Sequence, residues 1–226
     1  MDKSQQDADK LAAAKAAVKF VKDGDIVGLG TGSTATYAIK ELGKLVSEGL
    51  SIKAVGSSIR TEGLAKSLGI ELLNLGEVAH IDVSIDGADE FTESLNLIKG
   101  GGGALFREKI LASLSKNRII VTDASKRVSQ LGAFTLPVEV IPAAFQYVIG
   151  QITSLNAKPV QRFEQQLAYV TDNGNYIVDV DFGFIENPKT LSNQLNNIDG
   201  LLAHGLFVGL TDKIIMSNQN NLTIFE

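Results

Sequence analysis

The sequence predicts an α/β protein in which a Rossmann-like, mostly parallel sheet domain carries a smaller ferredoxin-like α+β domain inserted near the C-terminus. The first observation is that short apolar segments alternate with helical segments through the first half of the chain, as in parallel sheets with helices on both faces. The second is a change near Leu136 to the order βαββαβ, which is typical of a ferredoxin-like unit. The third is the length, because 226 residues, 44% of them hydrophobic, can bury a core of this size.

The elements of the first domain follow from two periodicities. Apolar residues three and four positions apart indicate helices, and short apolar runs bounded by turn residues indicate strands. The expected strands cover residues 25–29, 52–55, 71–73, 81–85, 95–98 and 118–122. The expected helices cover residues 9–21, 33–48, 61–68 and 104–114. Because helices and strands alternate here, most of the strands are expected to be parallel.

The smaller domain is expected over residues 132–206, which leaves residues 1–131 and 207–226 for the first domain. Its predicted elements are a strand over 136–142, a helix over 143–155, strands over 160–163 and 176–180, a helix over 189–197 and a strand near Leu206. The tail after Gly209 contains strands but too few apolar residues for a core of its own. It is therefore expected to return to the first sheet.

The composition excludes several kinds of chemistry. The chain contains no cysteine, which rules out disulfides, thiolate nucleophiles and cysteine-ligated metals. Its two histidines, His80 and His204, are flanked by apolar residues and are interpreted as structural. A net charge of −5 without a basic block argues against nucleic acid and anionic membrane surfaces as partners. No apolar run approaches the ~18 residues of a membrane span, and the first ten residues lack an apolar signal segment. Without cysteines to indicate the redox compartment, a cytoplasmic location is the default expectation and not a deduction.

A turn rich in glycine and hydroxyl groups lies between a predicted strand and a predicted helix. It reads Gly28-Leu29-Gly30-Thr31-Gly32-Ser33-Thr34. Backbone amides at a helix start, together with three hydroxyls, favour an anion such as phosphate. The turn lacks the lysine of a P-loop, and Ser33 stands where the dinucleotide fingerprint has its third glycine. The alternative is a tight turn in which Ser33 or Thr34 caps the helix.

An acidic segment, Asp86-Gly87-Ala88-Asp89-Glu90, directly follows a predicted buried strand. The carboxyl ends of parallel strands line the ligand-binding edge of such sheets, so these carboxylates are candidates for a polar site. A metal site is the weaker interpretation, because hard cations require more oxygen ligands at defined positions. A solvated acidic turn is the alternative without a function.

Four consecutive glycines follow Lys99, at Gly100, Gly101, Gly102 and Gly103. Each costs about 0.5–1 kcal/mol relative to alanine, and a turn requires only one or two. The surplus predicts a backbone nest whose amides face an oxygen atom of a ligand. A flexible linker is the alternative, but the short connections typical of such folds argue against it.

A glutamate, Glu108, lies one turn into the helix that follows the glycines, and its helical neighbours are mostly apolar. This environment predicts a semi-buried glutamate and not a merely solvated one. The alternative is a first-turn glutamate that complements the helix dipole. Lys10, Lys99 and Lys126 are the basic residues nearest to these motifs in the sequence, and each alone could be a surface lysine.

Together these segments resemble ribose-5-phosphate isomerase of the A type. The resemblance also includes Ala124-Ser125-Lys126, the segment from Leu136 to Pro142 and the segment from Val170 to Asn175, in the same order along nearly the whole chain. Phe106 occupies a variable position before the Arg-Glu-Lys run, and the tail after Leu210 is less similar to the family.

The resemblance implies an enzyme that interconverts ribose 5-phosphate and ribulose 5-phosphate without metal or cofactor, usually as a homodimer or a dimer of dimers. It implies that Glu108 is the general base. Lys99 would stabilise an oxyanion together with the amides of Gly100, Gly101, Gly102 and Gly103. Asp86 and Asp89 would bind sugar hydroxyls and assist ring opening. It implies a phosphate site made of Thr31, Gly32, Ser33, Thr34, Lys10 and Lys126.

Two other functions use part of the same motifs. A non-catalytic sugar-phosphate sensor would need the phosphate turn but neither Glu108 nor Lys99. A nicotinamide-dependent dehydrogenase would need an acidic residue after the second strand, where the sequence has Ser57 and Ser58. The joint presence of glutamate, lysine and glycine nest therefore favours the isomerase.

Overall fold

The computed structural model describes residues 3–226 and confirms the predicted α/β fold class. The chain forms two compact units. The first comprises residues up to Ala88 together with Arg107–Arg127 and Gly209–Glu226, and the second comprises Asp89–Phe106 and Val128–Val208. This division differs from the expected domain boundaries chiefly in grouping residues 89–106 with the second unit. The reason lies in strand pairing, because this segment forms two short strands that pair with each other, and the second of them also pairs with a strand that begins at Leu206.

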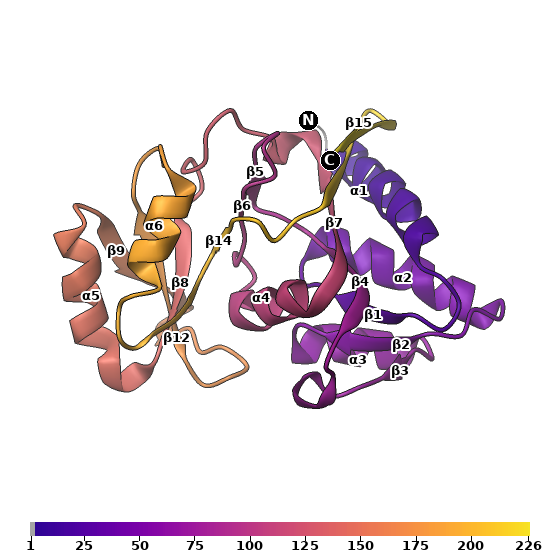
Figure 1. The fold of residues 1–226 in the computed structure, drawn as a ribbon, viewed down its shortest axis with the longest axis horizontal. Helices are drawn as coiled ribbons and strands as arrows, with labels where there is room; N and C mark the ends of the chain where they lie inside the picture. The colour runs from indigo at the N-terminus through magenta and orange to yellow at the C-terminus, as the bar shows by residue number, and fades with distance from the viewer. Residues whose placement is uncertain (1–2) are drawn as a thin grey trace. The chain divides into compact units, whose positions relative to one another are not determined.

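The first unit is built on a seven-stranded sheet with the order β16-β15-β7-β4-β1-β2-β3 (Figure 1). The strands are β1 (Ile26–Leu29), β2 (Lys53–Gly56), β3 (Glu71–Leu72), β4 (Ile81–Asp86), β7 (Ser115–Asp123), β15 (Lys213–Asn218) and β16 (Asn221–Phe225). All neighbours are parallel except β15 and β16. Counted from β3, the parallel strands follow the doubly wound order 3-2-1-4-5-6, whose direction reverses between β1 and β4.

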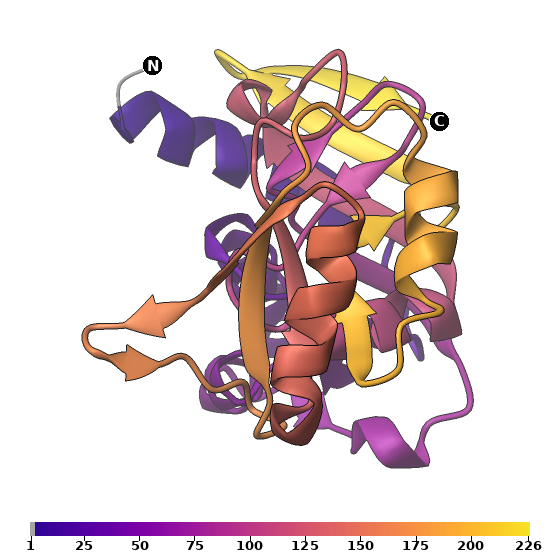
Figure 2. The ribbon, with the colours of Figure 1, turned by 90° about the vertical axis from the view of Figure 1, so that its left-hand side faces the viewer.

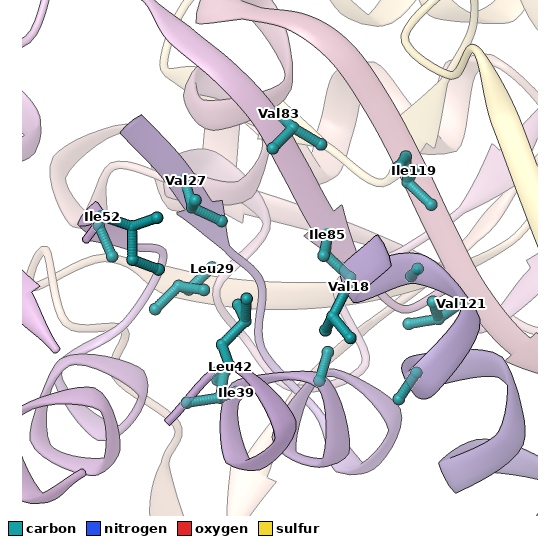
Figure 3. Packing of buried hydrophobic residues seen from close by; sticks show 14 of the residues in the cluster. Val18, Val27, Leu29, Ile39, Leu42, Ile52, Val83, Ile85, Ile119 and Val121 are labelled. Atoms are coloured by element: carbon teal, nitrogen blue, oxygen red, sulfur yellow. The ribbon is translucent and has the colours of Figure 1, made fainter. Parts of the chain in front are cut away.

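Apolar side chains on one face of this sheet pack against helices α1 (Lys3–Ala17), α2 (Ser33–Ser47) and α3 (Ile59–Ser67). Val27, Val83 and Ile119 of neighbouring strands point the same way because side chains alternate along a strand. Figure 3 shows them in one apolar cluster, in which Leu42 of α2 lies beside Leu29 of β1. Helix α4 (Leu105–Leu114) covers the other face through Leu111, which packs with Val55 and Ile81. The sheet therefore has helices on both sides, as the sequence predicted.

The tail returns to the first sheet, as predicted, because β15 pairs in parallel with β7. The expected helix over 9–21 begins earlier, at Lys3, and its last turn is a 3₁₀ helix over Val18–Phe20. None of the helices in residues 3–226 is long and apolar enough to span a bilayer.

The second unit contains the expected ferredoxin-like βαββαβ arrangement as a four-stranded antiparallel sheet of order β13-β8-β12-β9. Its elements are β8 (Leu136–Val140), α5 (Phe145–Ser154), β9 (Lys158–Gln161), β12 (Tyr176–Asp181), α6 (Pro188–Leu195) and β13 (Leu201–His204). A short hairpin of β10 (Phe163–Glu164) and β11 (Leu167–Ala168), which the sequence did not reveal, extends away from this sheet (Figure 2).

One strand prediction in this unit is wrong. The segment near Leu206 is not the fourth strand of the ferredoxin-like sheet, because β13 (Leu201–His204) takes that place. Leu206 belongs instead to β14 (Leu206–Phe207), which pairs with β6 (Leu97–Ile98), and β6 pairs in turn with β5 (Glu90–Phe91). Two adjacent apolar runs separated by one glycine could not be told apart by periodicity alone.

Candidate active site

The carboxyl ends of β1 and β4 meet where the strand order of the first unit reverses, and the residues that follow these strands contact one another. Oδ1 of Asp86 accepts hydrogen bonds from the amide of Thr31 (3.2 Å) and from that of Gly87 (2.7 Å). Gly30 must be glycine because a Cβ atom there would overlap the Asp86 carboxylate. Asp86 is 8% exposed, so its carboxylate fixes the glycine-rich turn from the buried side.

A cluster of hydroxyl groups holds the side chain of Thr31. Its Oγ1 lies 2.7 Å from Oγ of Ser57 and 2.9 Å from Oγ of Ser58, and Thr61 donates from its own hydroxyl to the carbonyl of Gly30 (3.0 Å). Ser57, Ser58 and Thr61 are all buried. Sequence reasoning noted Ser57 and Ser58 only for the acidic residue they replace. Their position after β2, the strand beside β1, is the signal that could have identified them.

Helix α2 begins at the turn without a side-chain cap. Gly32 is its N-cap residue, and no side chain accepts a hydrogen bond from its first amides. The alternative in which Ser33 or Thr34 caps the helix is therefore wrong. Ser33 is exposed and is the first residue of the helix, where the unpaired amides and the dipole favour an anion.

Glu108 lies in the first turn of α4 and is 4% exposed. The helix runs toward Ser115, where β7 begins, and β7 is parallel to β4, so the end of α4 that carries Glu108 points to the carboxyl edge of the sheet. Leu111, one turn further along, packs against Ile81, which anchors this helix on the sheet. Glu108 therefore belongs to the same unit and the same edge as Thr31 and Asp86.

The two expected phosphate-binding lysines differ in their surroundings. Lys126 closes a short 3₁₀ helix (Ala124–Lys126) directly after β7, again at the carboxyl edge, and the buried Asp123 caps this helix by accepting from the amide of Ser125 (2.9 Å). Lys10 lies on α1, where its ammonium is 4.0 Å from Asp7. The sequence thus identified one lysine that follows a sheet strand and one that extends from a covering helix.

The second unit holds the other predicted residues. Lys99 is 3% exposed, and its ammonium lies 5.3 Å from the ring centroid of Phe207, a cation–π distance. Oδ2 of Asp89 accepts from the amide of Gly101 (2.8 Å), which ties this carboxylate to the glycine loop, Gly100–Gly103. A buried ammonium, a carboxylate and a glycine loop therefore lie within one unit.

Three other titratable residues, Glu90, His204 and His80, contact protein groups outside the proposed site. The buried Glu90 accepts from the amides of Gly132 (2.9 Å) and Phe134, so the third carboxylate of the acidic segment holds a loop. His204 contacts Asn196 within the ferredoxin-like sheet and its helix, and His80 lies 3.8 Å from Asp82, in agreement with their structural interpretation. Within residues 3–226, no cluster of three or more acidic or histidine side chains could hold a metal ion.

The first unit has the features of an enzyme site for an anionic small molecule. An uncapped helix start lies at the switch point of a doubly wound sheet, and a buried glutamate lies at the same edge. This combination defines a class of α/β enzyme that binds an anionic group and transfers a proton beside it.

Comparisons with known proteins identify the family. The family model for ribose 5-phosphate isomerase A (phosphoriboisomerase A) matches residues 53–221. The ribose-5-phosphate isomerase A of Bacillus mycoides is 46% identical over 94% of this chain and 97% of its own. The structure of ribose 5-phosphate isomerase A from Methanocaldococcus jannaschii, 38% identical, superposes with a TM-score of 0.92 over 97% of this chain and 98% of that one. A D-ribose-5-phosphate isomerase in complex with phospho-erythronic acid, 37% identical, gives 0.94 over all of both chains.

The chain belongs to the ribose 5-phosphate isomerase A family. It is an aldose–ketose isomerase that interconverts ribose 5-phosphate and ribulose 5-phosphate. The resemblance found in the sequence is therefore confirmed.

Proposed function

We propose that Glu108 is the general base of this isomerisation and moves one proton between C2 and C1 of the sugar phosphate through an enediolate. The observation that carries the proposal is the burial of Glu108 in the first turn of α4, at the edge where Thr31 and Asp86 lie. A carboxylate fixed in this way can accept and return the same proton, and the reaction needs no redox step.

We propose further that Lys99 and the glycine loop stabilise the enediolate oxygen, while Asp86 and Asp89 bind sugar hydroxyls and assist ring opening. The buried ammonium of Lys99 and its attachment to the loop segment support this role, since a preorganised cation stabilises developing negative charge. The bond from Gly101 to Asp89 supports a loop whose conformation is set before substrate arrives. No metal or cofactor is required by this scheme.

The phosphate group is proposed to bind at the start of α2, through Ser33, Thr34 and the backbone amides at Gly32, with Lys10 and Lys126 as cations. The absence of a side-chain cap on α2 supports this assignment. Thr31 acts at the same place through its backbone and through the hydroxyl cluster that fixes its side chain.

The purified protein, dialysed exhaustively against EDTA, is expected to convert ribose 5-phosphate to ribulose 5-phosphate, measured directly by the absorbance of the ketose. Full activity after chelation supports a reaction carried by side chains alone. Loss of turnover in EDTA that a divalent ion restores would contradict the proposed cofactor-free mechanism.

Ser33→Ala and Lys126→Ala are expected to raise the KM for ribose 5-phosphate, because each removes one partner of the phosphate. The value of kcat is also expected to fall, because remote contacts help to position the reacting carbons, but this fall is expected to be smaller than the rise in KM. Free ribose is expected to be a far poorer substrate than its phosphate. Equal kcat/KM values for ribose and ribose 5-phosphate would show that the phosphate site is misassigned.

We also propose that the protein acts in the cytoplasm as a homodimer. Several apolar side chains of the second unit are more than half exposed, namely Val160, Phe163, Leu167 and Phe184, and exposed apolar surface of this kind favours association with a second copy. Sedimentation equilibrium measures the assembly state, and a monomer at micromolar concentration would contradict the dimer.

A further inference from the structure

The carbonyl groups of the glycine loop are held by a side chain that lies far from it in the sequence. Nη1 of Arg162 donates to the carbonyl of Gly100 (3.1 Å) and to that of Gly101 (3.0 Å). The phenol of Tyr169 donates to the carbonyl of Gly102 (3.3 Å). Three successive carbonyls of the loop thus point to one side, toward two side chains of the same compact unit.

Arg162 is itself fixed in place. Its Nε donates to Oδ2 of Asp179 (2.8 Å), and Nη2 donates to the other carboxylate oxygen, so the pair is bidentate. The side chain of Arg162 is only 15% exposed, and its guanidinium lies 5.7 Å from the ring centroid of Tyr169. Its backbone is anchored as well, because the amide of Tyr169 donates to the carbonyl of Arg162 (2.9 Å).

The direction of the carbonyls determines the direction of the amides. In a trans peptide the C=O and the following N–H point to opposite sides. The amide of Gly101 accordingly reaches Asp89. The amide of Gly103 turns back onto the carbonyl of Gly100 (3.0 Å) and closes the loop. The amide of Gly102 follows the carbonyl that Arg162 holds, so it points away from the guanidinium. Gly102 itself is exposed.

Tyr169 completes the arrangement by its close approach. A Cβ atom at Gly103 would overlap the Tyr169 hydroxyl, and the φ angle of Gly103 is +77°. Burial raises the pKa of Tyr169 above its ordinary value, which keeps the phenol protonated and able to donate. Both side-chain partners, Arg162 and Tyr169, therefore hold the loop in the same conformation.

We propose that Arg162, held by Asp179, is a positioning residue for the isomerisation. It fixes the carbonyls of Gly100 and Gly101, and this directs the amide of Gly102 toward the substrate oxygen that becomes negative in the enediolate. This inference rests on the proposed oxyanion role of the glycine loop. Arg162 acts through the loop and does not itself contact substrate.

The test uses Arg162→Lys, which keeps the charge but cannot bind Asp179 and both carbonyls at once. The expected result is a fall of about 10–100-fold in kcat, as for partial loss of an oxyanion donor, with the KM for ribose 5-phosphate changed by less than about threefold. The affinity for phospho-erythronic acid, whose carboxylate presents two oxygens as the enediolate does, is expected to fall together with kcat. The affinity for inorganic phosphate is expected to remain unchanged.

Arg118→Lys is the matched control. Arg118 also forms a bidentate pair with an aspartate, Asp212, and also donates to the carbonyl of a glycine, Gly209 (3.3 Å), but it lies in the amino-terminal half of β7. This variant is expected to keep kcat within a factor of two or three.

Two further variants, Asp179→Asn and Tyr169→Phe, leave Arg162 in place and repeat the test if Arg162→Lys does not fold. Each is expected to lower kcat less than Arg162→Lys would, with the KM unchanged.

An Arg162→Lys protein with the kcat of the unmodified enzyme overturns the inference, and so does one that loses affinity for inorganic phosphate as strongly as for phospho-erythronic acid. Lys99→Met separates this failure from failure of the proposed oxyanion site. If Lys99→Met lowers kcat and Arg162→Lys does not, only the positioning role is wrong. If neither variant lowers kcat, the oxyanion site itself is misassigned.

Discussion

Glu108→Gln is expected to lower kcat by about 10²–10⁴-fold, the usual contribution of a positioned general base. Glutamine preserves the size and most of the hydrogen bonding of the side chain but cannot accept a proton from C2 at neutral pH. The KM for ribose 5-phosphate is expected to change little, since the phosphate contacts are intact. Steady-state kinetics of the folded variant, with circular dichroism to confirm the fold, make the measurement.

A second glutamate on a neighbouring helix provides the control for this substitution. Glu62 of α3 pairs with Arg107, the residue before Glu108, at 3.7 Å. Glu62→Gln makes the same chemical change beside the site and is expected to leave kcat within a few-fold. If Glu108 only complements the helix dipole, its replacement costs about 0.3–1 kcal/mol of stability and leaves the enzyme active. A kcat for Glu108→Gln within a few-fold of the unmodified enzyme would refute the catalytic assignment.

Lys99→Met is expected to lower kcat by about 10²–10³-fold, the range seen when one donor to an oxyanion is removed. Methionine retains the apolar stem against the ring of Phe207 but removes the ammonium. Since the substituted group acts on charge that develops only in the transition state, kcat should fall far more than KM rises.

The contact with Phe207 offers a different role for Lys99, namely stabilisation of the fold through a cation–π interaction. Phe207→Leu tests it, because this variant removes the ring and keeps the ammonium. It is expected to lower the melting temperature while kcat changes by only a few-fold. Equal losses of kcat in Phe207→Leu and Lys99→Met would indicate that packing, not the charge, is what the site requires.

The site residues were found in the sequence to the extent that their chemistry is local. The turn at Gly30–Thr34, the acidic segment at Asp86 and the glycine loop each follow a strand and carry their own pattern of glycine, hydroxyl or carboxylate. The burial of Glu108 was expected from its apolar helical neighbours, and it is 4% exposed. Arg162 carries no such pattern, because its partners, Asp179 and the glycine loop, are 17 and about 60 residues away in the chain.

The sequence by itself determined the alternation of helices and strands, the change to a ferredoxin-like unit near Leu136 and the return of the tail to the first sheet, because these depend on periodicities within each segment. Only the tertiary structure decided strand partners. Leu206 pairs with β6, and residues 89–106 join the second unit. Hydrogen bonds between distant strands, and the hydroxyl cluster that links Thr31 to Ser57 and Thr61, join residues that only folding brings together. Side-chain spacing along the sequence carries no record of them.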